Sequence, residues 1–397
     1  MNPSSTAAIT MAVCAGLTLF CSFVDRLSWP PVIPLASREL ELTAAQAGGF
    51  MSAFFFGYLL TQLPGGMLAD RWGTRKVLLL SLVLMGVFTA SIAWASGFWS
   101  GIALRFVAGL GSGAVLAASV KGVYDYFAPR RRATAMGFFL ASMPLGLLAA
   151  NLMAPALASA YGWRAAFLAA GGLTLAVWLL AFIALPYHRG TNRLLPAGTK
   201  TNLAALLANR DLMLTAAAGF FAMWGTWGTL TWANAYMSQS LGLTLPQAGQ
   251  MMAIFGLGAL IGQPLAGWFA DRYLRYRRQT GMAILLVFAG VLWLFGINRE
   301  ASLLVFLCPL LGAGSFVFGP VLNTFISELV APYQVATAIG LCNSIWQIGS
   351  LISPVLAGLI LDMTGSYSWA FAVLAAGPLI AVAVLSLVRV SGIRTEG

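Results

Sequence analysis

Twelve long apolar segments constrain the fold of this chain more than any other feature. A helix needs about 20 predominantly apolar residues to cross the hydrocarbon of a bilayer. The segments lie at roughly 8–36, 45–68, 77–97, 102–125, 133–159, 164–186, 212–239, 247–270, 280–297, 302–329, 336–361 and 369–390. Charged residues make up 8% of the 397 residues, whereas a soluble domain carries about 25%. The sequence therefore predicts an all-α polytopic membrane protein with twelve transmembrane helices.

A charged loop follows the second apolar segment and returns in altered form after the eighth. The first copy reads GMLADRWGTRK over 66–76, and the second reads GWFADRYLRYRR over 267–278. Arginines, an aspartate and a turn glycine at the end of an apolar helix suit a short, tight loop between two membrane helices. The return of the pattern about two hundred residues later indicates that the chain contains two related halves.

A second repeat supports the same division. ATAMG opens the fifth predicted helix at 133–137, and ATAIG opens the eleventh at 336–340, 203 positions later. Gly146 and Gly349 keep the same offset. A polar stretch rich in proline and glycine separates the halves. The predicted organisation is an N-terminal six-helix half over 1–186, a cytoplasmic linker over 187–211 and a C-terminal six-helix half over 212–397.

The duplicated loop resembles the motif between the second and third helices of the major facilitator superfamily of secondary transporters. The resemblance covers the whole chain. It implies two pseudo-symmetric halves, a substrate site near the bilayer midplane between them, and alternating access by rocking. It also implies a gating role for the loop residues, which are Gly66, Asp70, Arg71, Gly73, Arg75, Asp271 and Arg272. We expect a monomer that works in the lipid bilayer without a cofactor.

The distribution of cations predicts the topology. If the N-terminus is cytoplasmic, the inner loops hold sixteen lysines and arginines, and the outer loops with their edges hold three. The positive-inside rule then places both termini in the cytoplasm of a multi-pass protein in the inner cell membrane. The formal net charge of +11 does not indicate a nucleic-acid partner, because the cations occupy short loops and not one face of a folded domain.

The sequence predicts neither a metal site nor an enzyme. Its four cysteines are Cys14, Cys21, Cys308 and Cys342, and all lie in apolar runs without metal-ligand spacing. We therefore expect them to be small packing residues. The sequence carries no phosphate-binding loop for ATP and no nucleophile with a plausible base, which also argues against a primary pump.

Charged residues inside predicted membrane helices include Asp25, Arg26 and Arg105. Each such residue costs about 2.5–3.5 kcal/mol on insertion scales, so it requires a partner or a wet cavity. Adjacent helical residues point about 100° apart, so Asp25 and Arg26 cannot both face one narrow site. One interpretation is a structural pair between Asp25 and either arginine. The other is that Arg26 presents its guanidinium fork to a ligand carboxylate.

A narrower resemblance favours the second interpretation. FVDR at 23–26, followed by SAFFFGYLLTQLPGG at 52–66, resembles the anion:cation symporter branch, which carries sugar acids and other organic anions. In that branch the helix-one arginine binds the substrate anion, the adjacent aspartate takes part in proton coupling and a helix-two tyrosine lines the site. The resemblance assigns these roles to Arg26, Asp25 and Tyr58. Two further matches to the branch are Arg105 in helix four and Asn343 in helix eleven, and the resemblance implies that both are substrate-binding residues.

The chain also departs from that branch. Seven residues after Arg105, where many members carry a protonatable glutamate, it has Ser112. Proton coupling must therefore rest on Asp25 alone or be absent. The seventh predicted helix is unusually rich in tryptophan, with Trp224 and Trp227 on one face at i, i+3. These indoles either pack against lipid or line the cavity, and in the second case the ligand has an apolar or aromatic surface.

Polar residues elsewhere in the helices are weaker candidates. Asn343 and Gln347 share a face at i, i+4, and Trp346 neighbours it, so all three are predicted substrate-binding residues. Their alternative role is to join helices within the bilayer. Lys121 lies one turn before Asp125 near a helix end. We expect these two to form a local i, i+4 ion pair with the lysine extended toward water.

The leading functional hypothesis is a secondary transporter that moves a small organic anion by symport, driven by a proton or sodium gradient. One alternative is a proton-coupled exporter of amphipathic drugs, suggested by the aromatic seventh helix. Another is a membrane sensor that binds a ligand on the same scaffold without transporting it. The sequence does not identify the substrate or distinguish import from export.

Overall fold

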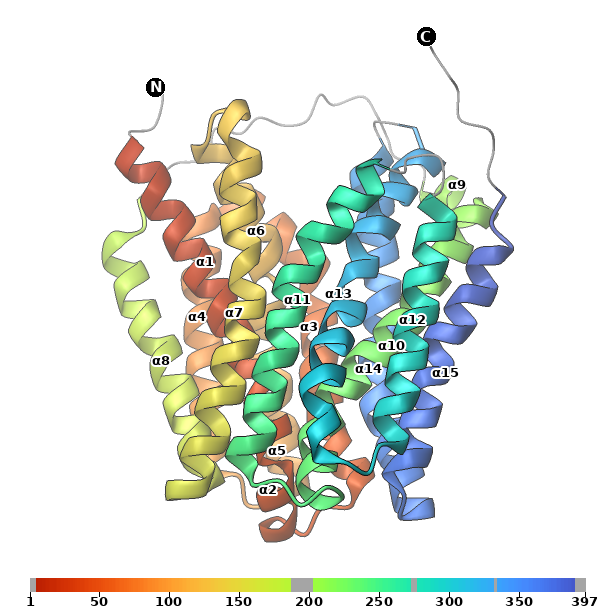
Figure 1. The fold of residues 1–397 in the computed structure, drawn as a ribbon. Coiled ribbons are helices and arrows are strands. Elements are labelled where there is room, and N and C mark those ends of the chain that lie inside the picture. Colours follow the sequence, from red (N-terminus) through yellow and green to blue (C-terminus); the bar gives the residue numbers. More distant parts are fainter. Residues whose placement is uncertain (1–4, 187–202, 273–276, 332–333, 390–397) are drawn as a thin grey trace. The chain divides into compact units, whose positions relative to one another are not determined.

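The structure is a computed structural model that describes residues 5–186, 203–272, 277–331 and 334–389 (Figure 1). All regular elements in these ranges are helices. The α-helices are α1 (Ser5–Leu27), α2 (Ile33–Glu39), α3 (Ala44–Trp72), α4 (Thr74–Ser91), α5 (Phe98–Gly113), α6 (Val115–Tyr126), α7 (Pro129–Tyr161), α8 (Trp163–Ala184), α9 (Leu203–Ala208), α10 (Arg210–Gln239), α11 (Leu245–Arg272), α12 (Arg277–Ile297), α13 (Leu304–Leu329), α14 (Val335–Thr364) and α15 (Tyr367–Ser386). The all-α prediction is confirmed.

Ten helical stretches among the described residues are long and apolar enough to cross a membrane. The ten do not include α3 and α10. These two helices have 29 and 30 residues, which exceeds the length needed to span the hydrocarbon. Both are rich in glycine and in hydroxyl, amide or indole side chains, which lowers their hydropathy. The protein is thus multi-pass, and the count of twelve spans stays a prediction for α3 and α10.

The structure divides the first predicted segment into two helices. Helix α1 ends at Leu27, and a short 3-10 turn over Pro30–Val32 leads into α2. Proline lacks the backbone N–H that a continuing helix requires, so Pro30 begins this turn. The buried Trp29 indole donates to the carbonyl of Ala47 at 2.9 Å and stacks on Phe50 with ring centroids 4.4 Å apart. These contacts hold the break against α3.

The predicted linker is partly helical. Residues 187–202 lie outside the described ranges, and α9 begins directly after them. This short helix forms because its sequence, LAALLA, is apolar and favours helix. Leu206 is buried in a hydrophobic cluster that also contains Leu212 and Leu385. The C-terminal part of the predicted linker therefore packs onto the helices that follow it.

The described chain forms two compact units. Unit 1 contains residues 1–193 and 231–253, and unit 2 contains 194–230 and 254–397. The last turns of α10 and the first turns of α11 thus belong to unit 1. Within that unit, the side-chain amide of Asn234 on α10 donates to Asn151 on α7 at 3.0 Å, and both residues are buried. Unit 1 therefore includes residues 231–253, which the predicted division places in the C-terminal half.

The internal repeat appears in the helix packing of each unit. A Cβ at Gly109 of α5 would overlap the carbonyl oxygen of Phe54 on α3, and a Cβ at Gly312 of α13 would overlap that of Phe255 on α11. These glycines are 203 positions apart. Because backbones approach this closely only where a side chain is absent, small residues set the helix contacts. Each unit uses the same close approach between corresponding helices.

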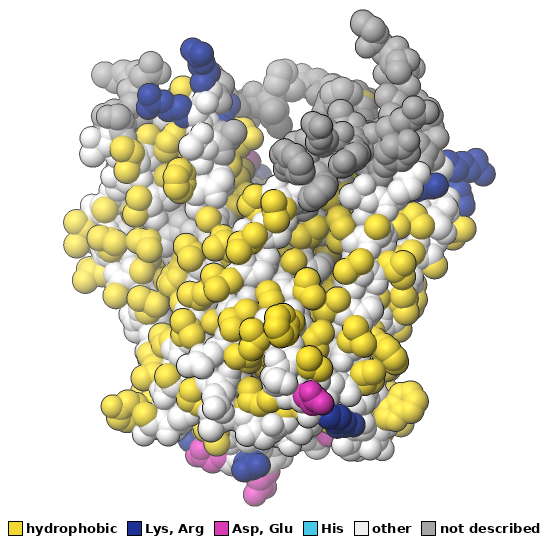
Figure 2. All heavy atoms as spheres, in the orientation of Figure 1, with side chains coloured by type: hydrophobic (Ala, Val, Ile, Leu, Met, Phe, Trp, Pro, Cys, Tyr) yellow, Lys and Arg dark blue, Asp and Glu magenta, His cyan; other side chains and the backbone are white. Residues whose placement is uncertain are grey.

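Large hydrophobic side chains remain exposed on the helices. Figure 2 shows them spread over the middle of the visible face, with lysine, arginine and acidic side chains toward its two ends. The exposed set includes Phe138, Ile183, Val287, Phe306 and Trp369. A surface of this kind is stable in contact with lipid, since burying it in water-free hydrocarbon removes the penalty of hydrating it.

Candidate functional site

Asp25 and Arg26 leave α1 on different faces and enter different surroundings. The Asp25 side chain is 0% exposed, and the Thr174 hydroxyl on α8 donates to its two carboxylate oxygens at 3.1 Å each. Arg26 is 3% exposed and points toward α3 and α5. The two charges are therefore adjacent in sequence but occupy separate helix interfaces.

Aromatic rings and a hydroxyl surround the Arg26 guanidinium. Its Nη2 donates to the Ser112 Oγ on α5 at 3.3 Å. Four ring centroids lie 4.7–5.2 Å from its Cζ: those of Phe23, Phe54, Phe55 and Tyr58. Cation–π contacts of this kind stabilise a guanidinium by about 0.5–2 kcal/mol each. The structure thus brings the Tyr58 ring beside the Arg26 guanidinium.

Two serine hydroxyls complete this arginine site. Ser22 lies one turn before Arg26 on α1, and its Oγ is 2.6 Å from the Ser112 Oγ. Both serines are buried. Many members of the branch that the chain resembles carry a glutamate at the position of Ser112. Here the Ser112 side chain contacts Arg26 directly and presents a neutral hydroxyl. The sequence singled out Ser112 but missed Ser22, for which the i, i+4 spacing to Arg26 was the available signal.

Arg105 is held by backbone carbonyl groups. Its Nη1 and Nη2 donate to the carbonyls of Asp25 and Arg26 at 2.9 and 3.0 Å, and its Nε donates to the carbonyl of Phe50 at 3.3 Å. The side chain is 0% exposed and its Cζ lies 4.9 Å from the Phe54 ring centroid. Arg105 thus joins α5 to α1 and α3 at the backbone of the residues that carry the two other charges.

Three of the predicted site residues of unit 2, Trp224, Trp346 and Gln347, make contacts within that unit. The Trp224 indole donates to the carbonyl of Val373 on α15 at 3.2 Å, and Trp227 is buried. Trp346 is buried, with its ring against Gly219 of α10 and edge-on to Phe318. The Gln347 side-chain carbonyl accepts a hydrogen bond from Ser350 at 3.0 Å. Asn343 is half-buried on the same helix, α14.

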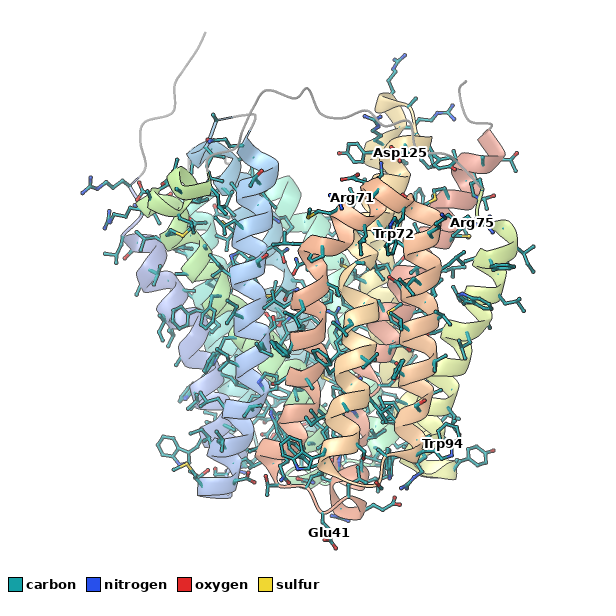
Figure 3. All side chains as sticks on the ribbon, turned by 180° about the vertical axis from the view of Figure 1, so that it is seen from behind. Glu41, Arg71, Trp72, Arg75, Trp94 and Asp125 are labelled. Atoms are coloured by element: carbon teal, nitrogen blue, oxygen red, sulfur yellow. The ribbon has the colours of Figure 1, made fainter. Side chains whose placement is uncertain are left out.

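The charged loop motif makes two kinds of contact at one end of unit 1, where Figure 3 labels Arg71, Arg75 and Asp125. The Asp70 carboxylate lies 3.5 Å from Lys121 on α6, and Lys121 also pairs with Asp125 at 3.0 Å. The i, i+4 pair predicted from the sequence is therefore confirmed, and the contact with Asp70 adds a link from α3 to α6. Arg71 is exposed.

Arg75 closes the other side of the same loop. Its guanidinium donates to the carbonyls of Phe182, at 2.6 Å, and Leu185 at the end of α8. Cations are favourable at the C-terminal end of a helix because the last carbonyls there lack intrahelical partners. Gly73 adopts a φ of +85° between α3 and α4, a conformation that side chains disfavour. In the second copy of the motif, the structure does not describe the side chains of Asp271 and Arg272.

Replacing Asp70 by asparagine should slow transport while expression stays near normal. The substitution removes the charge that pairs with Lys121 but keeps the size of the side chain. An exposed ion pair contributes about 0.2–1 kcal/mol, so we expect transport to fall by up to about fivefold. Initial flux into proteoliposomes at equal protein content measures the effect. Glu41→Gln, an exposed acid at the opposite end of the unit (Figure 3), is the control, and unchanged flux in Asp70→Asn would reduce the motif to a topological signal.

The structure gives no grouping of three or more histidine, cysteine or acidic residues suited to a metal ion among the described residues. The four cysteines are buried as free thiols, which agrees with the packing role expected for them.

The helices, the internal repeat and the buried charges define a polytopic α-helical membrane protein with pseudo-symmetric packing. The chain matches the family model described as Major Facilitator Superfamily over residues 15–236 and again over 215–395. The protein belongs to the Major Facilitator Superfamily, so it is a transporter and not an enzyme.

Curated relatives match nearly the whole chain. A "Probable sulfoacetate transporter SauU" from Cupriavidus necator is 27% identical, with 96% of this chain and 93% of that protein covered. The "Hexuronate transporter" of Bacillus subtilis is 27% identical, with 93% and 91% covered. The "Probable galactarate/D-glucarate transporter GarP" of Escherichia coli is 25% identical, with 91% and 90% covered.

Two solved structures share the fold. A bacterial homologue of the human lysosomal transporter Spinster, solved in an inward-facing, occupied conformation, gives a TM-score of 0.80 at 16% identity, with 95% of this chain and 96% of that chain covered. A structure of the nucleoside transporter NupG gives a TM-score of 0.81 at 14% identity, with 95% and 99% covered.

Proposed function

We propose that the protein transports a small organic anion across the inner membrane by alternating access. The observation that carries this proposal is the buried guanidinium of Arg26, which lies among hydroxyls and aromatic rings and forms the cationic group of the site. A guanidinium keeps its proton under physiological conditions and binds oxyanions through paired N–H donors. The relatives named for sulfoacetate, hexuronate and galactarate or glucarate support it, because each of these substrates is an organic acid.

In this proposal Arg26 binds the anion and Tyr58 lines the site beside it, while Arg105 positions α1 through backbone carbonyls. Trp224, Trp227, Asn343, Trp346 and Gln347 are the candidates from unit 2. Of these, the Trp224 indole is already engaged by the carbonyl of Val373, which favours a packing role for that side chain.

Counterflow into proteoliposomes tests the function. Vesicles loaded with one organic acid from a panel should exchange it for labelled external acid, and Arg26→Ala should abolish this exchange. Efflux of an amphipathic cation that is unaffected by Arg26→Ala would instead support a drug exporter. Ligand binding without any flux would support a membrane sensor. Absence of both binding and flux across the panel would contradict the proposal.

We further propose that Asp25 couples transport to protons. Its carboxylate lies in an apolar interface with Thr174 as a donor, and its backbone carbonyl is bound by Arg105, so movement of α1 during transport would change its surroundings. A change of surroundings alters the proton affinity of a buried carboxylate. Ser112 supplies no carboxylate for this task.

Asp25→Asn should therefore exchange the anion across the membrane but fail to accumulate it. The amide keeps a hydrogen-bonding group for Thr174 yet cannot release a proton. Exchange and concentrative uptake are measured on the same proteoliposomes, with wild-type protein plus a protonophore as the reference for uncoupled transport. Full concentrative uptake by Asp25→Asn would exclude this coupling scheme.

The proposed topology has both termini in the cytoplasm. Reporter fusions in the segment 187–202 and after Gly397 should both give a cytoplasmic signal, because the basic loops direct these segments to that side. A periplasmic signal from either fusion would contradict the twelve-helix arrangement.

A further inference from the structure

The groups around Arg26 distinguish between kinds of anion. At position 112 a carboxylate would compete with a bound substrate for the guanidinium, whereas the Ser112 hydroxyl accepts one N–H at 3.3 Å and carries no opposing charge. Both Ser112 and its partner Ser22 are about 1% exposed. Both hydroxyls are therefore buried beside the Arg26 guanidinium and not on the protein surface.

The two hydroxyls can donate more than the contact between them uses. Ser22 and Ser112 carry one hydroxyl proton each, and their mutual hydrogen bond, at 2.6 Å, uses one of the two. Whichever serine donates, one hydroxyl proton stays available for a further acceptor. When Ser22 is the donor, the remaining proton is on Ser112, whose oxygen accepts from Arg26, so this proton lies next to the guanidinium. The site thus combines planar guanidinium donors with a hydroxyl donor on a separate side chain.

This donor set suits an anion with three oxygens. A carboxylate has two oxygens in one plane, and a guanidinium fork engages both of them. A sulfonate has three oxygens arranged as a pyramid, so two can meet the guanidinium while the third accepts the hydroxyl proton. Only the three-oxygen group can accept this hydrogen bond at an oxygen that the guanidinium does not already engage.

The aromatic rings around the Arg26 guanidinium also favour a sulfonate over a carboxylate. The rings of Phe23, Phe54, Phe55 and Tyr58 lie 4.7–5.2 Å from the guanidinium carbon, so an entering anion exchanges water for apolar surface. The cost of removing an ion from water falls as its charge is spread over more atoms. A sulfonate spreads one charge over three oxygens and a carboxylate over two, which makes the sulfonate the less costly ion to desolvate here.

We propose that this site prefers an organic sulfonate to the carboxylate of matching size and charge. The inference rests on the proposed function, because it takes Arg26 as the anion-binding group. It adds a specificity role for Ser22 and Ser112, which together supply the donor for the third oxygen.

The test compares sulfoacetate with malonate, which have the same chain length and both carry two charges at pH 8. Binding to the purified full-length protein is measured by calorimetry, and exchange is measured by counterflow. Wild-type protein should bind sulfoacetate about tenfold more tightly, the ratio expected for one additional hydrogen bond to a charged group. Equal or tighter binding of malonate would overturn the inference.

The variant that tests the mechanism carries Ser22→Ala and Ser112→Ala together. Removing both serines deletes their mutual hydrogen bond completely, but it also removes an acceptor of the Arg26 guanidinium, so the unliganded Tm is measured to establish that the variant is folded. The double variant should bind the two probes with similar affinity, whereas Ser119→Ala, a buried serine on α6, should keep the wild-type ratio. A preserved ratio in the double variant would overturn the role of the hydroxyls.

The remaining outcomes separate this inference from the proposed function. If neither probe binds but other organic acids are exchanged, the sulfonate preference is wrong and the transport function stands. If no organic acid of the panel is bound or exchanged, the transport function itself is wrong.

Discussion

Replacing Arg26 by lysine should leave a folded protein that has lost most of its affinity for anions. Lysine keeps the positive charge, but its ammonium is a compact point charge and lacks the planar fork of donors. Hydrogen bonds to a charged group contribute about 1.5–3 kcal/mol, so losing one corresponds to roughly 10- to 100-fold weaker binding. The four rings that pack on the flat guanidinium would also lose part of their contact.

Calorimetric titration with an organic acid that wild-type protein exchanges measures this effect. The control is Arg164→Lys, which changes an arginine that pairs with Glu39 at the end of α2. This control should bind the anion as wild type does. Wild-type affinity in Arg26→Lys would remove Arg26 from anion recognition. A loss of the folded protein, seen in size-exclusion chromatography, would instead assign the residue a structural role.

The helices were predictable because the bilayer leaves few alternatives. A span needs about 20 apolar residues, and charged residues collect between spans, so composition and length alone locate most helices within a few residues. The break at Pro30 was less predictable. The two prolines indicate a bend in the first segment, but the full separation of α1 from α2 depends on the Trp29 contacts with α3, which only the folded chain defines.

The sequence names residues for a candidate site but does not identify the residues that contact them. Helical geometry required Asp25 and Arg26 to face different neighbours, and the structure gives them Thr174 and Ser112 respectively. No local pattern in the sequence points to Thr174, because it lies on α8, 149 positions from Asp25. The same holds for Lys121: its pairing with Asp125 follows from i, i+4 spacing, whereas its contact with Asp70 depends on how α3 packs near α6.

The hydrogen-bond acceptors of Arg105 could not be predicted from the sequence. The resemblance assigns it to the substrate site, and its intramembrane charge is compatible with that role. Its guanidinium, however, donates to the backbone carbonyls of Asp25, Arg26 and Phe50. The sequence identifies the arginine as a donor but not the groups that accept from it. Every residue has a backbone carbonyl, so residue type does not show which carbonyls are the acceptors.

Replacing Arg105 by methionine should therefore lower stability more than it lowers the anion affinity of the folded fraction. Methionine fills part of the space but donates to none of the three carbonyls, and each buried acceptor left without a donor costs about 1–3 kcal/mol. The yield of monodisperse protein and its Tm measure the loss, and Arg105→Lys, which keeps a donor, should recover part of it. Calorimetry on the surviving folded protein then separates the two roles. Wild-type yield and Tm combined with lost anion binding would return Arg105 to the substrate site, whereas a low Tm with retained affinity would identify it as the residue that holds α1, and with it Arg26, in position.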